Sequence, residues 1–507
     1  MKQKVLLYQI FNSVFAALFL VLIGIVVFAH NNPFLSLKKI PLIGLAALLC
    51  AGFAVLAMLW HRYGQAPQRE RLVVGLLLAG YLAVQVVVGL QLQVIPRRTW
   101  DFPMVFYQAQ QFVLEGTAPD EYFALFDNNA PLYWLFVGLF TVLKPIGVQD
   151  FMPATVVCNC LLINVALLYL YRTARLFWGP KWALAALVAA FCCPALVLYG
   201  PIVYTDTLTL PAVTISLYHW LRARGSWAEQ NKSGARRHAA AAGAAAAVGT
   251  VLKVSVAILF IAYCIDLVLL WQKKQKHSVF LCFAACFLIL LAAGNWASRA
   301  ALPEYQEEGV PFTHWIMMGL QGDGGYWDPD YKATLSYDTY AERAAFHRAE
   351  IRARLAAMTP AQLLVHCANK LSYIVSDGTY YAPVKLDQGP KRVTTLHTFI
   401  VPGSGAAGML YYAADALQLC LLLGCMLSAL RAVVTKQHQL TVLRVAVFGC
   451  LLFLLIWEAR SRYLLNFWPL LLLCAVSTVV PETGRLERQK LRTQSKPTVP
   501  FRTEPFQ

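Results

Sequence analysis

Long runs of apolar residues, separated by short polar or basic connections, recur along most of the chain. Many of these runs reach the roughly 20 residues with which an α-helix crosses the hydrocarbon core of a bilayer. The pattern predicts an all-α polytopic membrane protein with about twelve transmembrane helices. The predicted spans lie near residues 5–29, 40–60, 72–95, 151–172, 182–203, 207–224, 238–253, 254–271, 278–298, 408–434, 441–458 and 463–481.

Composition supports a membrane protein. Hydrophobic residues make up 59% of the 507 residues and charged residues only 14%, whereas soluble domains carry about 25% charged residues. The net charge of +17 does not require a nucleic-acid partner, because cytoplasmic loops of membrane proteins are enriched in Lys and Arg. The thirteen cysteines show neither metal-ligand spacing nor a disulfide framework.

Basic residues are concentrated in every second connection, which predicts that both termini are cytoplasmic. These connections cover residues 2–4, 62–71, 172–181, 222–237, 273–276, 431–436 and 485–496. Lys38 and Lys39 do not fit this alternation. The protein is expected in a plasma membrane, and a bacterial source is our working assumption.

The same alternation decides how the apolar run 131–147 is interpreted. If this run crossed the membrane, the basic connection 172–181 would lie outside. We therefore expect a juxtamembrane or re-entrant helix on the outer face, where it can pack on protein.

The expected organisation follows from these assignments. Residues 1–71 hold two N-terminal spans, and 72–298 form a core whose outer loop is 96–150. Residues 299–407 form a large outer loop or small subdomain, 408–481 hold the last spans, and 482–507 form a basic cytoplasmic tail.

Six ionisable side chains are predicted at one membrane depth, at the outer ends of different spans. They are Asp101, Asp206, Lys253, Glu458, Arg460 and Arg462. Ionisable groups near the hydrocarbon are costly and usually face a cavity or a partner. The cations suit a phosphate group, and Asp101 is placed to accept a proton from an attacking hydroxyl.

Structural explanations for these residues stay open. Asp101 and Asp206 each stand where a helix N-cap is expected. The arginines and Lys253 are able to snorkel toward the interface, and Arg460 or Arg462 is able to pair internally with Glu458.

Several segments resemble the GT-C superfamily of integral membrane glycosyltransferases. They are an outer-loop Asp after an early helix, "FVLEGTAPDEYF…NNAPLYWLFVGLF", a later Tyr-x-Asp at 204–206 and "EARSRYL…P" from residue 458. The protein O-mannosyltransferases (family 39) and the lipid A aminoarabinose transferases look most similar. The resemblance covers most of 72–481, and residues 1–60 look like two helices added ahead of it.

The resemblance implies a donor sugar on a polyprenyl phosphate and a glycan, lipid or protein acceptor. The acceptor attacks the anomeric carbon with inversion, and lipid phosphate leaves. Asp101 takes the role of general base, and Asp206 that of a second acid. Arg460 and Arg462, with Lys253 beside them, neutralise the phosphate, so neither a metal nor another cofactor is required.

One departure concerns the first outer loop. Family 39 enzymes usually show two adjacent acids there, whereas Trp100 and Phe102 flank a single Asp. Candidates for a second acid are Glu115, Asp120 and Glu121.

The large loop contributes further candidates. His314 and Trp315 are expected, with Glu458, to line a sugar or acceptor pocket, since aromatic rings stack on the apolar faces of sugars. The glycine-rich segment after them and the Asp-Pro-Asp at 328–330 are typical of turns.

The expected function is therefore glycosyl transfer at the outer membrane face. A polymerase or ligase of lipid-linked glycans, and a flippase or transporter of lipid-linked sugars, are the alternatives. A transporter predicts internal repeats and broken helices near the bilayer midplane, and the sequence shows no inverted repeat.

Overall fold

The computed structural model of the chain describes residues 2–29, 32, 36–95, 100–270, 276–305 and 308–481. Within these residues every regular secondary-structure element is a helix, which confirms the predicted all-α polytopic class. The predicted tail 482–507 lies outside the described residues.

Seven of the described helices are long and apolar enough to cross a membrane. They cover Leu6–Phe28, Lys39–Tyr63, Glu70–Gln91, Asp127–Ile146, Met152–Ala190, His277–Ala300 and Ala407–Thr435. Shorter apolar helices cover Val254–Leu269, Thr441–Ile456 and Ser461–Val476. The total of about twelve spans stays a prediction.

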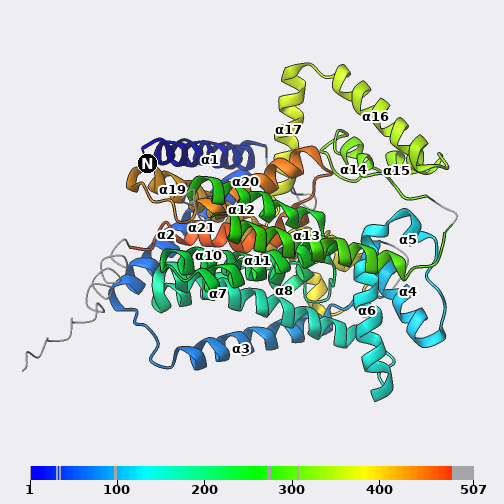
Figure 1. The fold of residues 1–507 in the computed structure, drawn as a ribbon, viewed down its shortest axis with the longest axis horizontal. Coiled ribbons are helices and arrows are strands. Elements are labelled where there is room, and N and C mark those ends of the chain that lie inside the picture. Colours follow the sequence, from blue (N-terminus) through cyan, green and yellow to red (C-terminus); the bar gives the residue numbers. More distant parts are fainter. Residues whose placement is uncertain are drawn as a thin grey trace, which may run out of the picture.

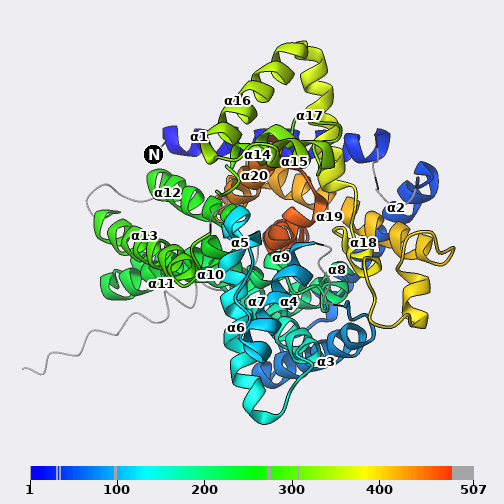
Figure 2. The same cartoon turned by 90° about the vertical axis from the view of Figure 1, so that its right-hand side faces the viewer.

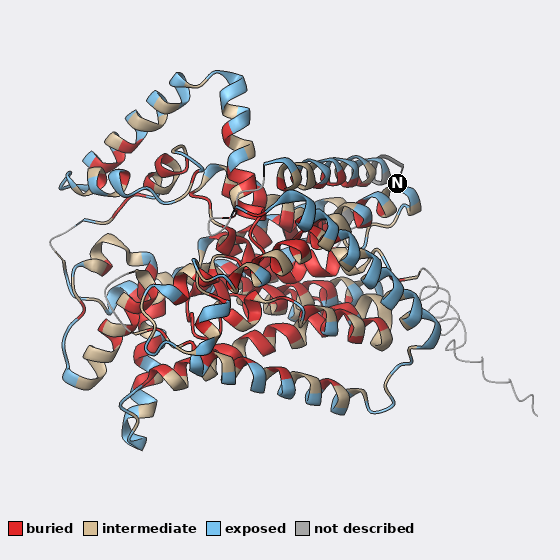
Figure 3. Cartoon of the chain, turned by 180° about the vertical axis from the view of Figure 1, so that it is seen from behind, coloured by how far each residue is buried: buried red, intermediate tan, exposed pale blue. Residues whose placement is uncertain are grey.

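The long helices form a bundle in which most run along one direction (Figure 1). They are α1 (Lys2–Phe28), α2 (Lys39–Tyr63), α3 (Glu70–Gln91), α7 (Met152–Ala190), α10 (Leu210–Ala228), α11 (Lys232–Leu252), α12 (Ile258–Leu270), α13 (Lys276–Ala300), α19 (Ala407–Thr435), α20 (Thr441–Ile456) and α21 (Trp468–Val476). Buried residues concentrate in the middle of this bundle (Figure 3). Its outward faces expose large apolar side chains such as Leu20, Leu76 and Ile289, as expected of helices that face lipid.

Shorter helices cover one end of the bundle, which we call the capped end; Figure 2 looks onto it. They are α4 (Asp101–Glu115), α5 (Tyr122–Leu125), α6 (Ala130–Leu143), α14 (Thr313–Met318), α15 (Asp328–Leu335), α16 (Tyr340–Ala357), α17 (Pro360–Val375) and α18 (Ala382–Asp387). The two regions predicted to lie outside, 96–150 and 299–407, thus meet at the same end. Backbone pairing joins them directly, because Ile95 N–H donates to Gly389 O and Lys391 N–H to Gln93 O, both at 2.7 Å.

The segment around α6 is apolar enough to span a membrane by length and composition alone. In both views, however, α6 runs across the direction of the long helices (Figures 1 and 2). A helix that lies along the membrane rather than through it takes such an orientation.

The span predicted over 182–203 is wrong in its second half. The helix α7 contains a break at Gly179, whose φ of 78° suits glycine, and it ends at Ala190. Only the single-turn helix α8 (Ala195–Leu198) follows before residue 205. Prolines at 194 and 201 account for the interruption, since proline lacks the N–H that a helix interior needs. The irregular segment carries the chain to Tyr204 and Asp206.

The alanine- and glycine-rich segment 239–249 packs closely on its neighbours. It lies in α11, between α10 and α13. A Cβ atom at Gly243 would overlap the carbonyl oxygen of Phe283 in α13. Small residues therefore let these helix backbones approach each other.

Lys370 in α17 connects the short helices of the capped end, which we call the cap, to the bundle. Its side chain is fully buried, and Nζ donates to the carbonyl oxygens of Gly319, Leu455 and Trp457, each at 2.8 Å. A Cβ atom at Gly319 or Gly324 would press against this lysine or its acceptors. The glycine-rich segment 319–325 thus allows close packing around Lys370 as well as forming turns.

We expect Lys370→Met to destabilise the protein by about 3 kcal/mol, because three buried carbonyl groups lose their donor. The measurement is the apparent unfolding temperature of the purified protein in detergent. Lys332→Met is the control, since Lys332 is 75% exposed in a surface ion pair with Asp328 and such pairs contribute little. Equal unfolding temperatures for the two variants would show that Lys370 does not hold the cap.

Candidate functional site

Asp101 is the first residue of α4 and follows Trp100, which has extended backbone angles. Its Oδ1 accepts a hydrogen bond from the Tyr122 hydroxyl at 2.9 Å, and its Oδ2 one from the Tyr204 hydroxyl at 3.0 Å. Asn129 joins the two tyrosines, because its Nδ2 donates to the Tyr122 oxygen at 2.6 Å and its Oδ1 lies 3.1 Å from the Tyr204 oxygen. Asp101 is partly exposed, and in the described chain no cation is paired with it.

Asp206 has a different environment, although only Thr205 separates it from Tyr204. It lies in the short helix α9 (Thr205–Leu208) and is 1% exposed. Its carboxylate forms ion pairs with Lys253 and with Arg462, the latter at 3.4 Å. Within the segment 204–206, Tyr204 therefore contacts Asp101, and Asp206 contacts the two cations.

The two cations come from breaks in helices. Lys253 follows α11 in an extended conformation before the 3-10 helix η3 (Val254–Ala257). Arg462 is the second residue of the 3-10 helix η5 (Ser461–Phe467), and this helix begins directly after Arg460, which has extended backbone angles. Such irregular backbone at membrane depth is tolerated where it is buried in protein or lines a cavity. The Lys253 and Arg462 side chains keep 12% and 10% of their surface exposed.

Glu458 and Arg460 form the second ion pair of the site. Arg460 Nε lies 3.2 Å from Glu458 Oε1, and the Tyr463 hydroxyl donates to Oε2 at 3.1 Å. The Arg460 guanidinium also lies over the ring of Tyr381, 4.7 Å from its centroid. Both glutamate oxygens are thus engaged by neighbours, and Arg460 keeps 13% of its side chain exposed.

Lys385 is a site residue that the sequence did not reveal. It lies in α18, with Nζ 4.1 Å from the ring centroid of Trp100, next to Asp101. Burial, followed by the positive charges of Arg462 and Arg460, lowers the pKa of Lys385 to about 7. The lysine thus faces the same cluster as the two arginines. A lone lysine in a polar loop carries no pattern that could have identified it.

A strained loop places α18. Tyr380 and Tyr381 have positive φ angles of 55° and 67°, which cost of order 1–3 kcal/mol each for non-glycine residues. Asp377 holds this conformation, because its carboxylate accepts from the backbone N–H groups of Thr379 and Tyr381 and from the Ser461 hydroxyl, at 2.8, 2.6 and 2.9 Å. Burial, with the nearby charge of Asp415, raises the pKa of Asp377 to about 6. The loop is thereby attached to the segment that carries the two arginines.

Among the described residues, the large-loop candidates make no hydrogen bond or ion pair with this cluster. His314 is buried, and its Nδ1 lies 2.8 Å from the Thr334 hydroxyl of the same loop region. Trp315 stacks on Trp457 with ring centroids 5.5 Å apart. Both side chains support the packing around the site, whereas the ionisable candidates at 101, 206, 253, 458, 460 and 462 come together.

Among the described residues, the candidates for a second acid have other roles or positions than contact with Asp101. Asp120 accepts from Gln108 Nε2 at 2.8 Å and fixes the chain just before Tyr122. Glu115 ends the helix that Asp101 begins, about 20 Å away at the rise of an α-helix. Glu121 is exposed.

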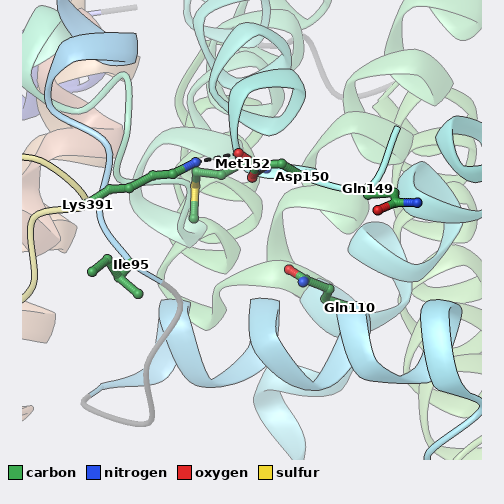
Figure 4. A pocket seen from close by; sticks show the side chains of 6 residues that line it. All are labelled: Ile95, Gln110, Gln149, Asp150, Met152 and Lys391. Carbon is green, nitrogen blue, oxygen red and sulfur yellow. Dashed lines mark hydrogen bonds and ion pairs between the residues drawn. The ribbon is translucent and has the colours of Figure 1, made fainter. Parts of the chain in front are cut away.

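A groove of about 390 Å³ at the capped end is separate from these residues (Figure 4). Lys391 extends across it to Asp150, and both side chains are about half exposed. Its lining residues are Ile95, Gln110, Gln149, Asp150, Met152 and Lys391. The predicted site residues do not contribute to it.

Residues 7–482 match a family model described as "Conserved hypothetical integral membrane protein". No curated protein and no solved structure matches the chain. The matched range contains the whole cluster, from Asp101 to Arg462.

The two aspartates should differ in their effect on stability. Asp206→Asn leaves Lys253 and Arg462 without their counter-charge, and breaking a buried pair in this way costs about 3–5 kcal/mol. Asp101→Asn removes no ion pair and should cost about 1 kcal/mol. Unfolding temperatures in detergent at one pH compare them, and a larger loss for Asp101→Asn would contradict the assignment of Asp206 as the structural acid.

Proposed function

The chain belongs to the family of conserved hypothetical integral membrane proteins, and we propose that its capped end is the active site of a glycosyltransferase. The enzyme moves a sugar from a polyprenyl-phosphate donor to an acceptor, with inversion at the anomeric carbon. One observation carries the proposal: among the described residues, Asp101 accepts hydrogen bonds from two tyrosine hydroxyls and forms no ion pair, while basic side chains gather next to it. The guanidinium of Arg462 lies 5.4 Å from the ring centroid of Tyr204, the residue that binds Asp101.

In this reaction Asp101 takes the proton of the acceptor hydroxyl or amine. The acceptor atom forms its bond to the anomeric carbon as the bond from that carbon to the phosphate oxygen breaks. The hydroxyls of Tyr122 and Tyr204 hold the carboxylate in one orientation, which suits a general base that must meet a bound acceptor.

The leaving lipid phosphate carries the negative charge away and needs cations beside it. Among the described residues, four basic and three acidic side chains face the cluster, so one positive charge is left over at pH values below the Lys385 pKa of about 7. The basic residues are Lys253, Lys385, Arg460 and Arg462, and the acidic residues are Asp101, Asp206 and Glu458. No metal or other cofactor has a role in this scheme.

Asp206 and Glu458 act as positioning residues in the proposal. Asp206 is buried and paired with two cations, so it holds Lys253 and Arg462 in place for the phosphate. Glu458 does the same for Arg460. In this proposal neither Asp206 nor Glu458 contacts the sugar directly.

We also propose that the capped end faces outward from a bacterial plasma membrane and that both termini are cytoplasmic. The α10–α11 connection supports this orientation. Asp206 before α10 and Lys253 after α11 both lie at the capped end, so the basic connection between the two helices lies at the opposite end. Basic connections favour the cytoplasmic side.

The test supplies the purified protein in liposomes with a panel of polyprenyl-phosphate sugars and follows the release of polyprenyl phosphate. Wild type should release it from at least one donor, and Asp101→Asn should be slower by about 100-fold or more, the usual contribution of a general base. Asp338→Asn is the matched control, because this aspartate is exposed in the same large loop.

Equal rates for wild type and Asp101→Asn, with unfolding temperatures preserved, would remove Asp101 as the base. Release from none of the donors, together with sugar-lipid transfer between leaflets, would favour a flippase.

Lys385 should make donor binding dependent on pH. Its pKa of about 7 means that the positive charge is present below that pH and lost above it. Affinity for a polyprenyl-phosphate sugar, whose phosphodiester keeps its charge, should fall about tenfold between about pH 6 and pH 8, the equivalent of one charge-assisted contact. In Lys385→Arg the guanidinium stays charged, so the affinity should hardly change with pH. The same slope in both proteins would show that Lys385 does not contact the phosphate.

A further inference from the structure

A series of aromatic rings leads from the acid at 101 to the surface of the cap. We define this aromatic row as Tyr122, Phe126, Tyr331, Tyr326 and Trp327. Ring centroids lie 5.3 Å apart for Tyr122 and Phe126, 6.2 Å for Phe126 and Tyr331, and 6.3 Å for Tyr331 and Tyr326. Trp327 follows Tyr326 in sequence, and these two residues are 48% and 47% exposed.

The row begins at the site itself. Tyr122 donates its hydroxyl to Asp101, and Tyr331 is close enough that burial and the negative charge of Asp101 both raise its pKa. The row therefore connects the proposed base to the water-exposed end at Trp327. Its members come from two regions far apart in sequence, the segment between α4 and α6 and the segment made of α15 and the loop leading into it.

Exposed aromatic residues in a membrane protein often mark the lipid interface. In Figure 1, α15 lies with α14 and α16 outside the bundle of long helices, at the end of the molecule away from the N-terminus. In Figure 2 it lies in front of α20 and close to α1. What distinguishes this row from an interfacial belt is its ring-to-ring continuity with Tyr122, which binds Asp101.

Polar groups accompany the rings. The Tyr326 hydroxyl donates to Asp328 Oδ1 at 3.3 Å, and both residues are exposed. Aromatic faces that carry hydroxyl and carboxylate groups at their edges suit sugars, which present apolar C–H faces and polar rims. A lipid tail would withdraw the Tyr326 hydroxyl and the Asp328–Lys332 ion pair from water, which is costly.

We propose that the aromatic row is the acceptor subsite and that the acceptor is a carbohydrate chain. The inference rests on the proposed transferase function and names the class of its acceptor. The sugar residue to be modified lies beside Tyr122, with its hydroxyl at Asp101, and the rest of the chain runs over Tyr331 and Tyr326 to Trp327. Protein and lipid acceptors are excluded by this assignment.

The test measures carbohydrate binding directly and needs no donor. Detergent-solubilised full-length protein is applied to an array of defined oligosaccharides that covers α- and β-linked chains of common hexoses, pentoses and N-acetylhexosamines. Wild type should bind at least one class of chain. Tyr326→Ala and Trp327→Ala should each weaken that binding about tenfold, whereas Tyr326→Phe, which keeps the ring, should lose less than Tyr326→Ala.

Tyr340→Ala is the matched control, because Tyr340 is 46% exposed in the same subdomain and does not belong to the row. Equal losses in Tyr340→Ala and Trp327→Ala would overturn the inference. Failure of wild type to bind any oligosaccharide on the array would also overturn it, as would weaker association of the row variants with phosphatidylglycerol vesicles at unchanged sugar binding.

These outcomes are distinct from failure of the proposed function itself. That failure appears in donor release that does not depend on Asp101, whatever the array shows. Array binding with the expected variant pattern supports the subsite on its own evidence.

Discussion

The site depends on a charge triad buried at the end of a helix bundle. Asp206, Lys253 and Arg462 come from three separate interruptions of helical structure, and Asp206 is almost fully withdrawn from solvent. Moving any one of these charges out of water alone would cost several kcal/mol. The three segments are therefore constrained to meet, and their meeting also fixes Tyr204 against Asp101.

A second constraint comes from the cap. Lys370 and Asp377 each satisfy several polar groups from different segments, and both are fully buried. Lys370 joins α14 and α17 to the end of α20, and Asp377 joins the loop before α18 to η5. The site is thus assembled from segments near residues 101, 204, 253, 385 and 460, and the last two are held by contacts outside the cluster. Such support is what keeps charged side chains in a productive arrangement.

The sequence was informative where a physical rule acts locally. Hydrophobic periodicity located the long helices, because a lipid-facing helix needs an uninterrupted apolar run. Ionisable groups at the ends of spans identified Asp101, Asp206, Lys253 and Arg462, because such groups are costly there without a partner. Chain breaks inside an apolar stretch, as in 191–204, were missed, since alanine, leucine and valine around the prolines mask them.

The remaining site residues could not be found because their contacts are long-range. Lys385 lies 284 positions from Asp101 in sequence, and its importance comes only from the loop that Asp377 shapes. His314 was expected in a pocket, but a buried histidine and a site histidine have the same sequence signal, and its hydrogen-bond partner Thr334 could not be read from the sequence. Likewise, an arginine beside a glutamate at 458–462 fits both an ion pair and an anion site, and the structure contains features of both.

The backbone pairing between residues 93–95 and 389–391 bears on how this protein could be recombined. This pairing joins the stretch leading to Asp101 to the stretch following Lys385, although a long part of the chain separates them. Residues 299–407 are therefore not a structurally independent segment. A chimaera that exchanged this region for that of a relative would keep its acid and its lysine in register only if residues 93–101 were exchanged with it.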